Sequence, residues 1–132
     1  MTPAKIVVDT NVYVSALIKP SGICGEVVAL ITKNRQNLLY DNRMISEYKE
    51  VLGREKFGFD KKDVSGLIDM IKNTGTKVYP FFIDKIFTDE TDKKFYEVFL
   101  GGNADFLITG NKKHFPESNK IISPAEYLSL FT

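Results

Sequence analysis

Several acidic residues in this chain stand where a parallel α/β fold would gather them at one edge of a sheet. Asp9 directly follows the apolar, β-branched residues 6–8, and Asp41 follows a second strand candidate at residues 38–40. Glu47 lies in the helical segment after Asp41, and Asp92 begins the helical segment before a later strand. Because ligands of open parallel sheets bind outside the carboxyl ends of the strands, we expect these carboxylates to surround a site there.

The helical periodicity places two of these carboxylates beside apolar stripes. Asp92 lies three residues before Phe95 and seven before Phe99, which share one helix face. Glu47 lies three residues after Met44, at the edge of the apolar stripe of its own helix. A carboxylate near a core is costly unless it is paired, hydrogen-bonded or bound to a metal. No arginine or lysine on either stripe is an obvious partner, which favours a metal.

The available ligands favour Mg²⁺ or Mn²⁺ over zinc. The chain has one cysteine, Cys24, and one histidine, His114, so a structural zinc cluster is excluded. Hard oxygen ligands select Mg²⁺ or Mn²⁺, and two such ions about 3.5–4 Å apart can activate water and stabilise the leaving oxygen of a phosphodiester. His114 itself is expected to be a loop or packing residue. The lysines flanking two acidic positions could hold a nucleic-acid backbone: Lys93, Lys94, Lys112 and Lys113.

The elements that would position these residues alternate between strands and helices. Such alternation predicts an α/β fold, a three-layer α/β/α sandwich with a mostly parallel sheet of about five strands. The expected strands are residues 6–8, 38–40, 76–79, 106–109 and 121–122. The expected helices are residues 12–17, 23–33, 42–54, 61–73, 91–100 and 125–130.

Local signals define several of these boundaries. Asn11 is expected to cap the first helix, Asp41 or Asn42 the third, and Ser123 the last, where Pro124 follows at the first helical position. Residues 80–88 are expected to form a loop with apolar anchors, which are Phe81, Phe82 and Phe87.

Composition indicates one globular domain spanning residues 1–132. At about 150 residues per domain the length gives roughly one unit, and 43% hydrophobic and 27% charged residues lie near the globular average. The net charge of +1 argues against strong non-specific binding to polyanions. The longest mostly apolar run, residues 12–18, is far shorter than the roughly 20 residues that span a bilayer. We therefore expect a cytoplasmic protein with no membrane partner.

Four ordered motifs resemble those of PIN domains. They are DTNV at residues 9–12, Glu47, DKKF at residues 92–95 and ADFLITGN at residues 104–111. VSAL at residues 14–17 and ISPAEYL at residues 122–128 resemble the branch described as toxins of toxin–antitoxin pairs. The resemblance covers nearly the whole chain, and the four motifs together are far more specific than any one of them.

The resemblance implies a Mg²⁺- or Mn²⁺-dependent ribonuclease that cleaves RNA with metal-activated water. Asp9, Glu47 and Asp92 match the family's metal-binding acids, but the position of the usual fourth acid is Asn111, which brings no charge. Asn111 is thus expected to assist catalysis, with a weakened or absent second metal. Residues expected to contact the RNA are Thr10, Asn11, Thr109, Lys112 and Lys113. A homo-oligomer (dimer or higher) and an antitoxin protein are further expectations from the resemblance.

Other interpretations of these residues remain open. Asp9 could cap the helix that follows it, Gly110-Asn111 could be a turn, and Lys112 and Lys113 could be a solvated pair. The whole domain could be a non-catalytic PIN-like module that binds RNA or protein through a weakened metal site. It could also be a receiver-type domain with Asp9 as phosphoacceptor, although no lysine stands at the end of the last strand.

Overall fold

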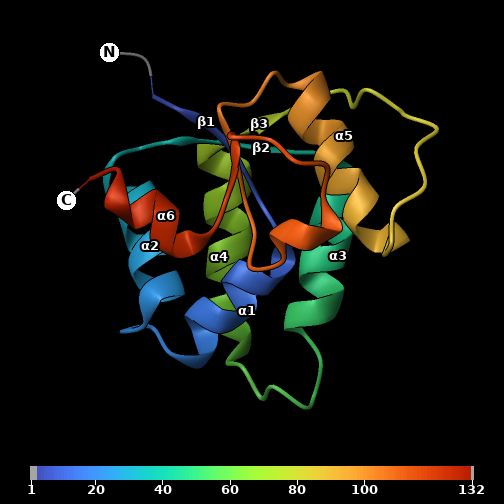
Figure 1. Cartoon of the computed structure of the whole chain (residues 1–132). Helices are drawn as coiled ribbons and strands as arrows, with labels where there is room; N and C mark the ends of the chain where they lie inside the picture. Colours follow the sequence, from blue (N-terminus) through green and yellow to red (C-terminus); the bar gives the residue numbers. More distant parts are fainter. Residues whose placement is uncertain (1–2, 132) are drawn as a thin grey trace.

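The computed structural model describes residues 3–131, in which strands and helices alternate along the chain (Figure 1). The strands are β1 (Lys5–Val8), β2 (Asn37–Tyr40), β3 (Thr76–Lys77), β4 (Phe106–Ile108) and β5 (Ile121–Ile122). The helices are α1 (Thr10–Ile18), α2 (Ile23–Lys33), α3 (Asn42–Leu52), α4 (Lys61–Thr74), α5 (Lys93–Gly101) and α6 (Pro124–Ser129). Two short 3-10 turns, η1 (Glu90–Asp92) and η2 (Lys112–His114), precede α5 and follow β4.

All five strands of the described chain run parallel, in the order β3-β2-β1-β4-β5. The order reverses at β1, so the topological switch point lies between β1 and β4, where open α/β sheets form their ligand crevice. The register pairs Val8 with Ile108. Asp9 directly follows β1 and Thr109 directly follows β4, so the two residues meet at the carboxyl edge of the sheet.

Helices cover both faces of the sheet, as the predicted α/β/α sandwich requires. α5 packs across β1, β2 and β4, and α3 lies beside it (Figure 1). α2 packs against α1 and α6 on the other side of the molecule. Because β1 is covered on both faces, Ile6, Val7 and Val8 are at most 1% exposed. This explains why residues 6–8 are all apolar rather than alternating between apolar and polar.

Most element ends differ from the expected ones by one or two residues. α1 begins at Thr10 with Asp9 at the N-cap position, so the expected cap at Asn11 was wrong. α3 ends at Leu52 with Gly53 at the C-cap, before the expected end at residue 54. Asp41 caps α3, and Ser123 and Glu126 form a reciprocal capping box at α6, as their sequence positions predict.

The segment between β3 and η1 differs most from its prediction. Phe87 is buried at 6% exposure, but Phe81 and Phe82 are 63% and 71% exposed, so the expectation that all three anchor the loop was wrong. β3 ends at Lys77, and Tyr79 beyond it is 91% exposed. The backbone of this segment is tied instead to α5, where Phe81 N–H donates to the Glu97 carbonyl at 3.0 Å.

Within the described residues no individual helix has the length and apolar character needed to cross a bilayer. α1 and α2 meet the criterion only when joined, and the chain bends by 108° between them.

Candidate metal centre

Asp9 lies at the switch point of the sheet, between the ends of β1 and β4. The residue is 4% exposed, and its Oδ2 accepts a hydrogen bond from Thr109 Oγ1 at 2.8 Å. Although Asp9 occupies the N-cap position of α1, its carboxylate makes no capping hydrogen bond. The capping interpretation of its side chain therefore does not hold, and the carboxylate is held by the neighbouring strand end.

Glu47 joins the same edge from α3, with both carboxylate oxygens engaged. Oε2 accepts a short hydrogen bond from Thr10 Oγ1, and Oε1 accepts from Lys94 Nζ at 2.6 Å. Lys94 Nζ also donates to the carbonyl of Thr91 at 2.6 Å. The expectation that Glu47 lacks a cationic partner was thus wrong, because Lys94 reaches it from the first turn of α5.

Asp92 stands at the junction of η1 and α5 and is 8% exposed. Its Oδ2 lies 3.0 Å from His114 Nδ1, which comes from η2. Asp89, at the N-cap of η1, accepts a hydrogen bond from the Thr91 N–H at 3.0 Å. His114 therefore belongs to the surroundings of Asp92, a contact that the loop-or-packing interpretation of His114 did not anticipate.

The charges of the neighbouring carboxylates act on Asp9 and Asp92. Burial raises the pKa of Asp9 to about 6, against the hydrogen bond from Thr109 that lowers it, and the charges of Asp92 and Glu47 raise it further. The pKa of Asp92 is also raised, first by burial, while its hydrogen bond to His114 lowers it and the charge of Asp89 raises it. The charges of Glu47 and Asp92 thus act on Asp9, and we call these three residues the carboxylate cluster, although the three do not together form a group of described ligand atoms that all lie within 4.8 Å of one another.

The chemistry of this donor set fits a hard divalent cation. Carboxylate oxygens from β1, α3 and α5 converge at the carboxyl edge of the sheet, and one of them, on Asp9, is buried and repelled by its neighbours. A divalent cation would relieve that repulsion, and oxygen donors suit Mg²⁺ and Mn²⁺. Lys94 and His114 are the basic side chains already in contact with the cluster.

The residues expected to contact substrate fall into buried and exposed groups. Thr109 is fully buried and Thr10 is 5% exposed; each donates its hydroxyl to a carboxylate of the cluster. Asn11 Oδ1 accepts from the Gly110 N–H at 3.4 Å. Asn111 is exposed, and its N–H donates to Thr109 Oγ1 at 3.0 Å. The two threonines therefore position carboxylates, whereas Asn111 faces solvent.

Two lysines follow Asn111 beside an open hollow. Lys112 Nζ forms an exposed ion pair with Glu126 at 2.7 Å, and Lys113 is exposed. A hollow of about 380 Å³ opens here. It is lined by Gly110, Asn111, Lys112, Lys113, His114 and Ser123.

A buried ionic network lies next to the cluster and was not foreseen. Arg43 Nε lies 2.8 Å from Asp41 Oδ2, and its Nη1 lies 2.8 Å from Glu97 Oε1. Asp41 and Glu97 are 6% and 4% exposed. Glu97 Oε2 also accepts from the Ile83 N–H at 3.0 Å, so this network fixes the segment that leads into η1. The sequence shows both acids, Asp41 after a strand and Glu97 within a helix, but it does not show that one arginine joins them across distant segments.

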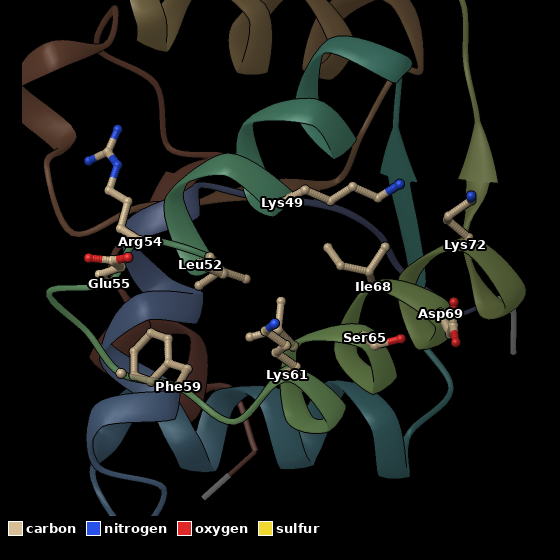
Figure 2. Close-up of a pocket in the computed structure, with 13 residues that line it drawn as sticks. Lys49, Leu52, Arg54, Glu55, Phe59, Lys61, Ser65, Ile68, Asp69 and Lys72 are labelled. Carbon is tan, nitrogen blue, oxygen red and sulfur yellow. The ribbon is translucent and has the colours of Figure 1, made fainter.

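A separate groove of about 500 Å³ runs between α3 and α4 (Figure 2). Leu52, Phe59 and Ile68 contribute apolar surface, and Lys49, Lys61 and Lys72 stand around it. None of the predicted site residues lines this groove. It lies apart from the carboxylate cluster.

Comparison with known proteins bears on the whole chain. A family model described as the PIN domain matches residues 5–113. A relative from Methanocaldococcus jannaschii, itself described only as an uncharacterized protein, is 26% identical over 145 residues. That match covers 96% of this chain and 91% of the relative. The matched family segment contains all three clustered carboxylates and His114's neighbours in η2, Lys112 and Lys113.

Proposed function

The chain belongs to the PIN domain family, and on that premise we propose that it is a Mg²⁺- or Mn²⁺-dependent endoribonuclease. One observation carries the proposal: Asp9 is buried at the carboxyl edge of the sheet, and Glu47 and Asp92, from two other segments, lie close enough for their charges to add to the effect of burial, which raises the pKa of Asp9 to about 6. Such repulsion is costly in a metal-free protein and useful in a metal-binding one.

Asp9, Glu47 and Asp92 would hold the cation in this proposal, and Asn111 would assist from the exposed rim. A bound Mg²⁺ or Mn²⁺ ion supplies Lewis acidity and a water of lowered pKa for attack on a phosphodiester. Thr109 and Thr10 fix the orientation of Asp9 and Glu47 through their hydroxyl donors. Lys94 holds Glu47 and must give up part of that contact when the carboxylate turns to a cation.

The RNA would lie over the hollow next to the cluster. Lys113 and Asn111 are exposed there, and Lys112 is available after it leaves its solvent-exposed pair with Glu126. Lysines at such positions contact phosphates without reading sequence. We therefore expect Lys113→Gln to weaken RNA binding with little effect on metal binding.

The test is cleavage of a mixed RNA by tag-free protein with Mg²⁺, Mn²⁺ or EDTA. We expect metal-dependent cleavage. Asp9→Asn and Glu47→Gln should each lower its rate by at least about a hundredfold, which is the usual loss when one group that stabilises charge in the transition state is removed. Glu50→Gln is the matched control, because Glu50 lies on the same helix as Glu47 but is exposed and pairs with Arg54. Intact RNA under every metal condition, with wild type and with Asn111→Asp, would refute the nuclease.

A non-catalytic RNA- or protein-binding module is the second candidate, and two observations favour it. Both oxygens of Glu47 are engaged by Thr10 and Lys94, and the fourth acid is replaced by Asn111. If wild type is inert but Asn111→Asp cleaves RNA, the site is a weakened one. If neither variant cleaves and RNA still binds, the module interpretation replaces the enzyme.

We further propose that the enzyme is the toxin of a toxin–antitoxin pair, acting in the cytoplasm as a homo-oligomer. Support comes from the sequence motifs at residues 14–17 and 122–128. Expression in a bacterial host should arrest growth, and Asp9→Asn should abolish the arrest. Co-expression of a small neighbouring reading frame should restore growth if that frame encodes the antitoxin.

A further inference from the structure

Three side chains of metal-ligating type lie close together around Asp92. Asp89, Asp92 and His114 each offer a ligand atom, and these atoms all lie within 4.8 Å of one another. Asp92 belongs to both groups, since its charge also reaches Asp9 and its own pKa responds to Glu47. Asp92 therefore links the two groups, and His114, whose side chain is 37% exposed, lies on the solvent side of Asp92.

Buried aromatic rings hold the segments that carry this cluster. Phe87, two residues before Asp89, packs edge-on against Phe115, the residue after His114, with ring centroids 6.0 Å apart. Phe87 also packs against Tyr96 of α5 at 5.7 Å, one turn after Asp92. Phe87 and Phe115 are 6% and 7% exposed. The three segments are thus fixed to one another by a shared core rather than by loop contacts alone.

The histidine lies close to Asp92, three residues after the position of the expected fourth acid. Asn111 can offer an amide oxygen but no charge, and it is exposed. Three residues later, η2 turns His114 onto Asp92, with Nδ1 3.0 Å from Oδ2. Asp89 adds a carboxylate on the same side. The donor set at this end therefore combines imidazole nitrogen with two carboxylates, whereas Asp9 and Glu47 offer oxygen alone.

We propose that His114 is a ligand of the divalent cation bound at Asp92, with Asp89 completing that end of the site; this inference rests on the proposed metal-dependent function. Oxygen donors suit Mn²⁺ as well as Mg²⁺ and Ca²⁺, but Mn²⁺ is a transition ion and accepts an imidazole nitrogen more readily than those two ions do. The protein consequently prefers Mn²⁺ to Mg²⁺ by more than an all-carboxylate site would. Removal of His114 lowers that preference.

The test is electron spin echo spectroscopy of Mn²⁺ bound to tag-free protein. Because His114 is the one histidine in the sequence, a strong nitrogen-14 coupling identifies it without isotope labelling. The signal is expected in wild type and should vanish in His114→Gln, which also distinguishes the imidazole from the Lys94 amine. The wild-type spectrum tests the ligand even if the variant folds poorly.

Titrations of Mn²⁺ and Mg²⁺ provide the second readout. We expect His114→Gln to weaken Mn²⁺ binding on the order of tenfold or more, and Mg²⁺ binding clearly less. Asp89→Asn should also weaken Mn²⁺ binding. Glu90→Gln is its matched control, an exposed carboxylate on the adjacent residue of η1 that lies outside the cluster.

The outcomes separate this inference from the proposed function. Mn²⁺ binding without nitrogen coupling, with equal affinity in wild type and His114→Gln, overturns the histidine ligand but leaves the carboxylate metal centre intact. Absence of Mn²⁺ binding in wild type overturns both. Nitrogen coupling in a protein that cleaves no RNA supports His114 as a metal ligand and rejects the proposed nuclease activity.

Discussion

Asp9 is 4% exposed, with one hydrogen bond from Thr109 and two carboxylates nearby. Its pKa rises from 3.8 to about 6, so the folded protein binds this proton more tightly than the unfolded chain. The metal-free protein therefore loses stability as pH rises from about 4 to 6, by about 2–3 kcal/mol, and does not recover it above pH 6. We predict that Asp9→Asn stabilises the metal-free protein at pH 7.5.

Thermal unfolding in EDTA checks this prediction. The asparagine variant should melt at a higher temperature than wild type at pH 7.5, and the difference should shrink as pH falls toward 4. With excess Mn²⁺ the order should reverse, because only wild type gains the free energy of metal binding. If Asp9→Asn is less stable than wild type in EDTA at pH 7.5, then the ionised Asp9 carboxylate does not destabilise the metal-free protein, and the prediction is wrong.

Thr109 provides a second prediction at the same scale. Its hydroxyl lowers the pKa of Asp9, so Thr109→Val should raise that pKa further and make metal binding require a higher pH. A hydrogen bond to a charged group contributes about 1.5–3 kcal/mol, which corresponds to roughly one pH unit or more. The measurement is Mn²⁺ affinity against pH. Thr109→Ser keeps the hydroxyl and should retain the wild-type dependence of Mn²⁺ affinity on pH. If Thr109→Ser and Thr109→Val shift this dependence equally, the packing of the threonine methyl group matters rather than its hydrogen bond.

The sequence could identify residues next to strands but not their partners across the fold. Asp9 and Asp92 follow from strand ends and helical spacing, which are local properties. Lys94 and Glu47 are 47 residues apart, and His114 and Asp92 are 22 apart. Each of these contacts depends on how helix axes and turns are placed, and hydrophobic periodicity carries no information about that placement.

The third prediction concerns how α3 and α5 are joined. Arg43 lies between Asp41 and Glu97, which are both buried, so Arg43→Met would leave two buried carboxylates without their cation. Breaking a buried pair in this way usually costs 3–5 kcal/mol; since Arg43 is partly exposed, we expect about 2–3 kcal/mol. Urea denaturation gives the free energy of unfolding.

Arg54→Met is the control for this change. Arg54, two residues beyond the end of α3, pairs with the exposed Glu50 four residues earlier, and such solvent-exposed pairs contribute little to stability. If both arginine variants lose the same small free energy of unfolding, the ion pairs of Arg43 do not stabilise the contact between α3 and α5.

The segment between β3 and η1 shows why element boundaries were harder to predict than element types. Phe81 and Phe82 have the composition of anchors, yet they are exposed, and the segment is fixed through backbone donors at Phe81 and Ile83 that bond to Glu97. Apolar character predicts burial, but it cannot reveal that a buried acid on another helix will hold the backbone. The strands and main helices, in contrast, follow from periodicity and caps.

At the scale of the whole molecule, the described residues share one core. Ile6 in β1 and Tyr127 in α6 are both fully buried and belong to the same cluster of packed apolar side chains. β1 lies at the centre of the sheet, and β5 joins it through β4. Loss of an edge element would therefore expose apolar side chains of this shared core to water. We accordingly propose that residues 1–132 fold as a single domain.

This arrangement predicts one cooperative unfolding transition in urea. Circular dichroism follows the helices, and tyrosine fluorescence follows the aromatic core, since the chain has 6 tyrosines and no tryptophan. In EDTA the two curves should coincide, with a slope of about 1–3 kcal/mol per molar urea. If β5 and α6 formed an independent unit, a change in helix signal would precede the loss of tyrosine signal from Tyr13 and Tyr48, which are buried and pack edge to face at 5.1 Å. Coincident curves would mean that the chain unfolds as one unit, so that the free energy of Mn²⁺ binding to the folded protein would add to the stability of the whole unit.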